Sequence, residues 1–186
     1  MRLAAERLVR AFAGTPSRVG LVLFSGPRNS TTLRACSRGA QPGEPTPRME
    51  QDCKIQWVSH LTDDMDGLAQ KVQGLTYPRG TSLTSSALAT AAAEMSQGRA
   101  DAGPVVIVIS DGRVMSPKLT RQAATFVKDR ARLLWVPVST YAKISDLKEW
   151  VSKPVRENVV RVKGFDKLKM PEAVSEIVSR VCPLVA

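Results

Sequence analysis

Pro104-Val-Val-Ile-Val-Ile-Ser-Asp-Gly112 is the stretch that decides the fold of this chain. An unbroken run of β-branched apolar residues that ends in a polar turn is typical of a strand covered on both faces, as in a parallel sheet. A second run of this kind is Arg18-Val-Gly-Leu-Val-Leu-Phe-Ser25. Between the two runs, Arg79-Gly-Thr-Ser-Leu-Thr-Ser-Ser-Ala-Leu88 predicts a turn that opens an alanine-rich helix. Two buried strands with a helix between them indicate an α/β fold.

The rest of the chain alternates between further helix and strand patterns. These patterns predict helices at 2–13, 63–72, 83–97, from Ser116-Pro117 onward, at 145–151 and at 166–181, and strands at 54–61, 133–138 and 158–162. Residues 26–53 are rich in proline and glycine and show no period, which predicts an inserted loop. Because helices separate most of the strands, parallel pairing with right-handed crossovers is expected. The sequence therefore predicts a doubly wound, mostly parallel sheet with helices on both faces.

Length and charge limit the classes of protein that need to be considered. A chain of 186 residues with 43% apolar composition is predicted to form one domain, 1–186, around a sizeable core. The formal net charge of +10 favours acidic partners such as sulfated glycans or acidic proteins, although a basic surface that only aids solubility is the alternative. No recognition helix, zinc finger or stacking platform accompanies the basic residues, so nucleic-acid binding is not expected.

No apolar run approaches the roughly 18–20 residues of a membrane span. Residues 1–13 carry Arg2, Glu6 and Arg10 through the region that would have to be apolar, which is not the pattern of a secretory signal peptide.

The three blocks quoted above, in their order, resemble the von Willebrand factor A (VWA) domain, also called the integrin I domain. The resemblance runs from about Arg2 to Cys182 and implies a Rossmann-type three-layer sandwich. In that family, a threonine of the middle block and the aspartate of the Asp-Gly turn help to hold a divalent metal, which captures a carboxylate of a protein partner. The resemblance therefore implies Thr81 and Asp111 as ligands of Mg²⁺ or Mn²⁺, in an adhesion module that binds a protein or matrix ligand.

Each of these two residues has a simpler interpretation. Thr81 could cap the following helix, a role that Ser82 or Thr84 could also fill. Asp111 could belong to an ordinary Asp-Gly turn. Hard cations need oxygen ligands, and two such residues alone would hold Mg²⁺ weakly or not at all.

The chain departs from the family at its start. Family members open with a central strand that ends in Asp-x-Ser-x-Ser, and no such motif occurs in these 186 residues. The resemblance thus implies a domain that lacks its first central strand. Its absence is expected to leave the strands Val19–Phe24 and Val105–Ile109 without their shared neighbour, with unpaired edges that favour aggregation.

Three cysteines bear on the cellular compartment. Cys36 and Cys53 flank the predicted loop and are candidates for a disulfide in an oxidising compartment; the alternative is three free thiols in the cytosol. Extracellular family members often join a cysteine before the first strand to one after the last helix. Cys182 matches the second of these, so the resemblance implies a partner upstream of Met1.

These observations leave several functions open. The leading hypothesis is a metal-dependent adhesion module, extracellular or on the cell surface as part of a longer protein. The alternatives are a cytoplasmic VWA scaffold that binds without metal, and a truncated fragment without independent function. An enzyme or nucleotide-binding protein is not expected, because neither Gly-x-Gly-x-x-Gly nor Gly-x-x-x-x-Gly-Lys-Ser/Thr occurs.

Overall fold

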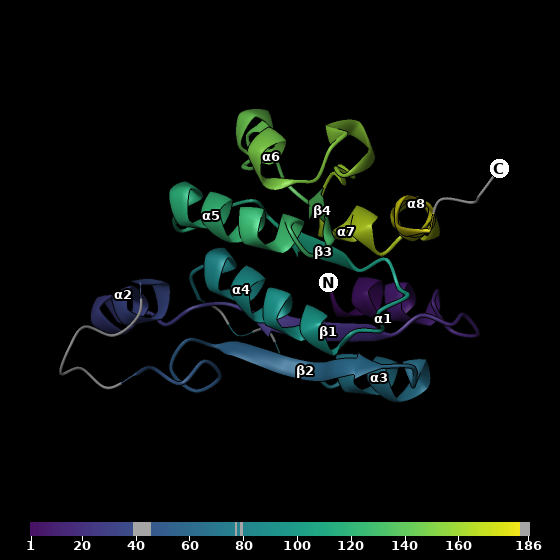
Figure 1. Cartoon of the computed structure of the whole chain (residues 1–186), viewed down its shortest axis with the longest axis horizontal. Helices are drawn as coiled ribbons and strands as arrows, with labels where there is room; N and C mark the ends of the chain where they lie inside the picture. The colour runs from purple at the N-terminus through teal and green to yellow at the C-terminus, as the bar shows by residue number, and fades with distance from the viewer. Residues whose placement is uncertain (39–45, 77, 79, 183–186) are drawn as a thin grey trace.

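A computed structural model describes residues 1–38, 46–76, 78 and 80–182 of the chain (Figure 1). Helices and strands alternate along most of it. In chain order they are α1 (Arg2–Arg10), β1 (Val19–Phe24), α2 (Ser30–Arg38), β2 (Ile55–Thr62), α3 (Met65–Gln73), α4 (Thr84–Glu94), β3 (Val105–Ser110), α5 (Pro117–Lys128), β4 (Arg132–Pro137), α6 (Ile144–Trp150), α7 (Phe165–Leu168) and α8 (Pro171–Val181), with 3-10 turns at Met95–Gln97 and Val155–Glu157.

The described strands form two separate pairs rather than one continuous sheet (Figure 1). β3 and β4 are parallel and in unbroken register from Val105 opposite Arg132 to Ser110 opposite Pro137. β1 and β2 are antiparallel, and their register shifts near Leu21. Within the described residues no ladder joins β1 to β3, as expected for two strands that lack a shared central neighbour.

Helices cover both faces of the β3–β4 pair. Because side chains alternate along a strand, successive residues of β3 point to opposite faces. Val106 and Val108 belong to one core, shared with α4, α5 and α6. Ile107 and Ile109 pack on the other side, against a core built from α1, α7, α8 and β4. The arrangement confirms the predicted α/β architecture with helices on both faces.

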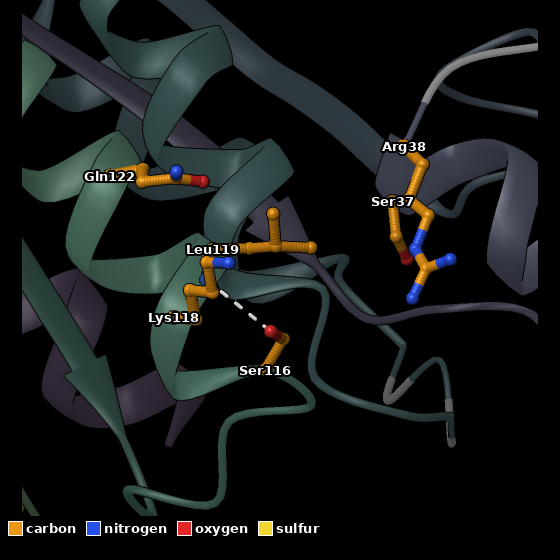
Figure 2. A pocket seen from close by; sticks show the side chains of 6 residues that line it. All are labelled: Ser37, Arg38, Ser116, Lys118, Leu119 and Gln122. Carbon is orange, nitrogen blue, oxygen red and sulfur yellow. Dashed lines mark hydrogen bonds between the residues drawn. The ribbon is translucent and has the colours of Figure 1, made fainter.

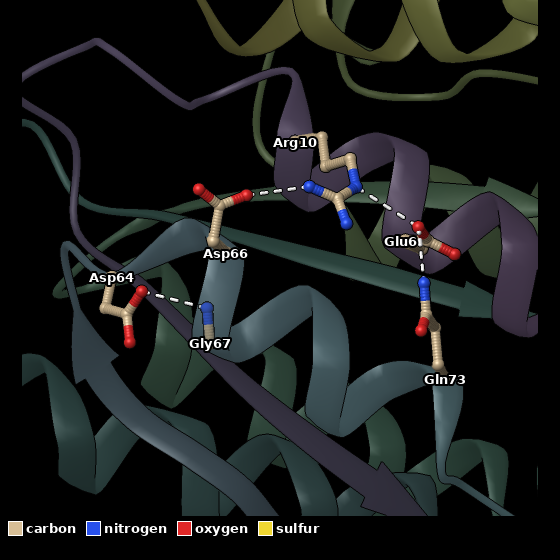
Figure 3. Close-up of polar contacts among 6 residues, drawn as sticks. All are labelled: Glu6, Arg10, Asp64, Asp66, Gly67 and Gln73. Atoms are coloured by element: carbon tan, nitrogen blue, oxygen red, sulfur yellow. Dashed lines mark hydrogen bonds and ion pairs between the residues drawn. The ribbon is translucent and has the colours of Figure 1, made fainter.

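α1 and α3 lie side by side and are linked by polar contacts (Figure 3). Arg10 bridges Asp66 on α3 at 2.7 Å and Glu6 on its own helix at 3.1 Å, and Gln73 donates to Glu6 at 2.9 Å. Asp64 caps α3 by accepting a backbone hydrogen bond in the first turn. Exposed ion pairs contribute little to stability, so the apolar core beneath these contacts is what holds the two helices together.

Glu94, at the end of α4, is a buried carboxylate that ties this helix to β2. It accepts hydrogen bonds from the backbone amide of Leu61 at 2.9 Å and pairs with the His60 ring at 3.0 Å. Burial by itself raises the pKa of Glu94, but these two hydrogen bonds outweigh it, so the pKa lies below the ordinary value of 4.5. The ionised carboxylate is therefore the form that stabilises the α4–β2 contact.

The predicted loop at 26–53 contains a helix, so the loop prediction is wrong for that part. α2 begins after Asn29, whose side chain accepts a hydrogen bond from the amide of Thr32 at 3.0 Å. Asparagine followed by serine and threonine is a helix-start signal that the proline and glycine content of the whole segment obscured. Residues 39–45 of the predicted loop lie outside the described residues.

Two other predictions fail near the end of the chain. The predicted strand 158–162 is reduced to a single parallel bridge between Val159 and Trp135, flanked by backbone hydrogen bonds to β4. The predicted helix 166–181 is divided into α7 and α8 at Met170, which has extended dihedrals. The reason is Pro171, because the residue before a proline is driven out of the helical region.

No helix within the described part of the chain has the length and apolar character needed to cross a membrane.

Candidate functional site

Three loops meet where β1 and β3 end. Ser25 directly follows β1 and Ser110 is the last residue of β3, and both are buried. The carbonyl of Ser25 accepts a hydrogen bond from the amide of Leu83 at 3.3 Å, at the start of α4. The amide of Met115, in the loop after β3, donates to the carbonyl of Ser82 at 3.3 Å. These bonds place the ends of β1 and β3 and the start of α4 at one edge, which is where open α/β sheets bind their ligands.

Two glycines allow the first two of these loops to approach closely. A Cβ on Gly80 would lie 2.6 Å from the Ser25 hydroxyl and 3.0 Å from the backbone nitrogen of Gly26. A Cβ on Gly26 would lie 3.0 Å from the side chain of Leu83. A Cβ on Gly26 would also collide with the Thr81 hydroxyl, and a Cβ on Gly80 with the carbonyl oxygen of Gly26, at separations that real Cβ atoms essentially never show. The loop after β1 and the loop before α4 therefore require glycine at both positions.

Thr81 lies in the second of these loops and is half-buried. Its hydroxyl donates a long hydrogen bond of 3.5 Å to the carbonyl of Pro27. The N-cap of α4 is Leu83, and no side chain caps this helix. Helix capping, the simpler interpretation of Thr81, Ser82 and Thr84, is therefore not their role here.

Asp111 follows β3 and shapes the turn after it. One carboxylate oxygen accepts a hydrogen bond from the amide of Arg113 at 3.0 Å, and the hydroxyl of Ser139 donates to the Asp111 carbonyl. The guanidinium of Arg113 lies over the ring of Tyr141 at 3.6 Å. Gly112 has a φ of +81°, and a Cβ there would collide with Ala142, in the loop between β4 and α6. The turn is thus tightly specified, and one oxygen of Asp111 already has a partner.

The donor set for a cation at this edge is small. The loops of Thr81 and Asp111 are joined through the Met115–Ser82 hydrogen bond, but among the described residues no hydrogen bond joins the two side chains themselves. Nor do the described residues contain a group of three histidine, cysteine or acidic side chains that could hold a metal. The oxygen atoms of Thr81 and Asp111 are ligands of the kind that Mg²⁺ and Mn²⁺ prefer. Because these are only two protein ligands, we expect weak binding that depends on water molecules retained by the cation.

Cys36 and Cys53 form a disulfide, with Cα atoms 5.6 Å apart and a sequence separation of 17. The bridge joins α2 to the segment just before β2. Cys182 is exposed and free within the described structure. Disulfides persist in oxidising environments, so the bridge favours an extracellular or secreted setting over the cytosol.

A cavity of about 470 Å³ lies beside this edge, between α2 and the start of α5. Its lining residues are Ser37, Arg38, Ser116, Lys118, Leu119 and Gln122. Sequence analysis missed it because the predicted loop left no helix opposite α5. The only available signal was the Asn29-Ser-Thr-Thr32 start of α2.

Comparison with known proteins defines the class to which this protein belongs. Residues 1–175 match the von Willebrand factor type A domain family, and the chain belongs to that family. VWA domains are in general protein-interaction modules, and this is the class of function that membership supports.

Solved structures show the same fold at low sequence identity. Proximal thread matrix protein 1 from the mussel byssus superposes with a TM-score of 0.71 at 15% identity; the match covers 98% of this chain and 42% of that one. The conserved hypothetical protein BatB from Bacteroides thetaiotaomicron gives a TM-score of 0.59 at 12% identity over 97% of this chain and 86% of its own. The chain thus spans less than half of the mussel protein. Comparison with curated proteins found no match.

Proposed function

We propose that this domain is an adhesion-type module that binds a protein or extracellular-matrix partner at the edge where β1 and β3 end. Asp111 and Thr81 would contribute a carboxylate and a hydroxyl to a weakly held Mg²⁺ or Mn²⁺. A cation with few anionic ligands stays electrophilic, so a carboxylate of the partner can complete its shell. The domain would act outside the cell or on its surface, and it performs binding rather than catalysis.

One observation carries this proposal: the backbone hydrogen bond from Met115 to Ser82 joins the loops of the two candidate ligands. Two further observations support it. Thr81 is not used as a helix cap, so its hydroxyl has no structural task beyond a long hydrogen bond to Pro27. The name of the mussel relative describes a matrix protein; at 15% identity this is a reason to test matrix ligands and nothing more.

The second candidate is a cytoplasmic VWA scaffold that binds its partner without metal. The small donor set at Asp111 favours it, and the disulfide between Cys36 and Cys53 opposes it. Mass spectrometry of the native protein after thiol blocking separates the two. A bridged pair supports the extracellular module, whereas two blocked thiols support the scaffold.

The metal site is tested with MnCl₂ alone, by following free Mn²⁺ with electron paramagnetic resonance. Asp111→Asn keeps an acceptor for the amide of Arg113 while removing the charge, and Thr81→Ala removes the hydroxyl. Both variants should weaken Mn²⁺ binding. Asp101→Asn is the control, because this exposed carboxylate precedes β3, at the other end of the strand. Undiminished binding by both site variants would refute the assignment of these ligands.

Partner binding is then measured against purified extracellular-matrix proteins on a sensor surface. Binding that requires Mg²⁺, is abolished by a chelator and is lost in Asp111→Asn supports the adhesion module. Binding that survives both the chelator and the substitution contradicts a metal-dependent mechanism and favours the scaffold.

A further inference from the structure

The cavity between α2 and α5 is lined by positively charged side chains. Figure 2 shows Ser37 and Arg38 on α2 facing the first turn of α5, which contributes Lys118 and Leu119. Two of the described lining residues are cationic and none of them is acidic. None of the ion pairs found among the described residues involves Arg38 or Lys118.

The α5 helix adds to this positive field. Its first turn contains no acidic residue, so nothing there offsets the partial positive charge of the helix N-terminus. The N-cap hydroxyl of Ser116 is engaged with the amide of Leu119 at 3.3 Å, as the dashed line in Figure 2 shows. An anion in the cavity would therefore meet two cationic side chains and a favourable helix end.

The α2 wall of the cavity is held in place from several directions. The disulfide from Cys36 joins it to the segment before β2, and the hydroxyl of Ser86 on α4 donates to the carbonyl of Cys36 at 2.8 Å. The Ser37 hydroxyl lies 3.8 Å from the sulfur of Met115, in the loop that follows β3. A wall fixed before the ligand arrives reduces the ordering cost of binding.

From these observations we propose that the cavity binds an acidic side chain of a protein partner. Arg38 and Lys118 pair with its carboxylate, and Leu119 packs against its aliphatic stem. A volume of about 470 Å³ lies within the usual range of roughly 300–1,000 Å³ for ligand sites, so the cavity accommodates a side chain with adjoining backbone. The side-chain amide of Gln122 can hydrogen-bond that backbone. The apolar side chain of Leu119 favours the aliphatic stem of an acidic residue over a sulfated sugar, which has no such stem.

This site is independent of the metal edge. Its cationic groups are side chains of the protein, so it should hold an acidic partner whether or not a divalent cation is present. The net charge of +10 would also speed the approach of such a partner, an effect that weakens as salt is added.

The test uses a fluorescein-labelled hexaglutamate peptide and measures its binding by fluorescence anisotropy. Arg38→Gln and Lys118→Gln should each weaken binding by about tenfold, the loss expected for one charge-assisted hydrogen bond. Arg156→Gln is the matched control, because it removes the same charge from a side chain that is 87% exposed and lies after α6, outside the cavity. It should change binding by no more than about twofold. Equal losses in all three variants would overturn the proposal, because they would show diffuse attraction to a basic surface.

Three further arms complete the experiment. Chelator should leave peptide binding unchanged; loss of binding in chelator would place the peptide at the metal edge and overturn the cavity assignment, whatever the outcome of the Mn²⁺ titration. The double variant Cys36→Ser/Cys53→Ser should lose binding while remaining folded by circular dichroism, since it frees the α2 wall. A heparin oligosaccharide that binds more tightly than hexaglutamate, with the same sensitivity to Arg38→Gln, would make this a glycan site and refute the peptide proposal.

Discussion

Removing the disulfide with Cys36→Ser/Cys53→Ser should cost about 3 kcal/mol of the free energy of unfolding. The bridge closes a segment with a sequence separation of 17. Cross-linking a loop of this length removes roughly 10 cal/mol/K of entropy from the unfolded chain, which gives the stated figure at 25 °C. Cys53 is fully buried beside Ile55 and Leu83, so the introduced hydroxyl adds a small further loss.

Equilibrium unfolding in urea measures this cost, with a thermal scan as a second readout. For a chain of this size the melting temperature should fall by roughly 6–12 °C. Cys182→Ser is the matched control, because this thiol is exposed and unbridged in the described structure, and it should leave both quantities unchanged. Added reductant should lower the stability of the wild-type protein to that of the double variant, and should not affect the double variant.

A loss below about 1 kcal/mol in the double variant, at an unchanged urea slope, would refute this reasoning. It would mean either that the unfolded chain already keeps the two cysteines close or that the bridge strains the folded state. In both cases α2 would be held by its contact with α4 rather than by the disulfide.

Three other outcomes follow from the structure. Glu94→Gln should cost about 1–3 kcal/mol at pH 7 in urea unfolding, because the charged acceptor of the Leu61 amide is lost. Since the folded pKa of Glu94 is lowered, its contribution is present above about pH 4.5 and declines as the pH falls through the folded value, so acid should narrow the gap between wild type and variant. Gly112→Ala should lower the free energy of unfolding by about 2 kcal/mol or more, because of the positive φ and the collision with Ala142. The control Gly103→Ala, with open space around it, should lower it by less than about 1 kcal/mol. Equal urea unfolding midpoints for the two variants would contradict the steric argument. Hydrogen exchange should be faster along the edges of β1 and β3 that no described strand covers than along their paired edges, and a sharp two-state melt with uniform protection would count against those open edges.

The sequence predicted strands most reliably where an unbroken apolar run indicated burial on both faces of a sheet. The predicted strand Val105–Ile109 is found and extends by one residue to Ser110, because a run of β-branched residues favours a strand covered on both faces. The helix at Pro117 begins where Ser116 and the proline indicated, with the serine hydroxyl as cap. The predicted strand 158–162 was wrong because Val159 forms only a single bridge with Trp135 of β4. A local sequence pattern cannot show how far the pairing between two strands extends.

The candidate site was predictable only in part. The Gly-Thr and Asp-Gly turns were visible as motifs, and the end of the strand before Asp111 fixed which edge they occupy. The engagement of one Asp111 oxygen by the amide of Arg113 was not visible, because it depends on the backbone path of the turn. The cavity was invisible for a stronger reason: Arg38 and Lys118 are separated by the whole of β2, α3, α4 and β3 along the chain.

The sequence by itself determined the alternation of helices and strands and the candidate disulfide, because periodicity, turn chemistry and cysteine spacing are local properties. Its three motif blocks also carried the resemblance to the VWA family. Only the tertiary structure decided that Thr81 caps no helix and that α2 stands opposite α5 across a basic cavity. These features arise from contacts between segments distant in the chain, where packing and hydrogen bonding select one arrangement among many that the local patterns allow.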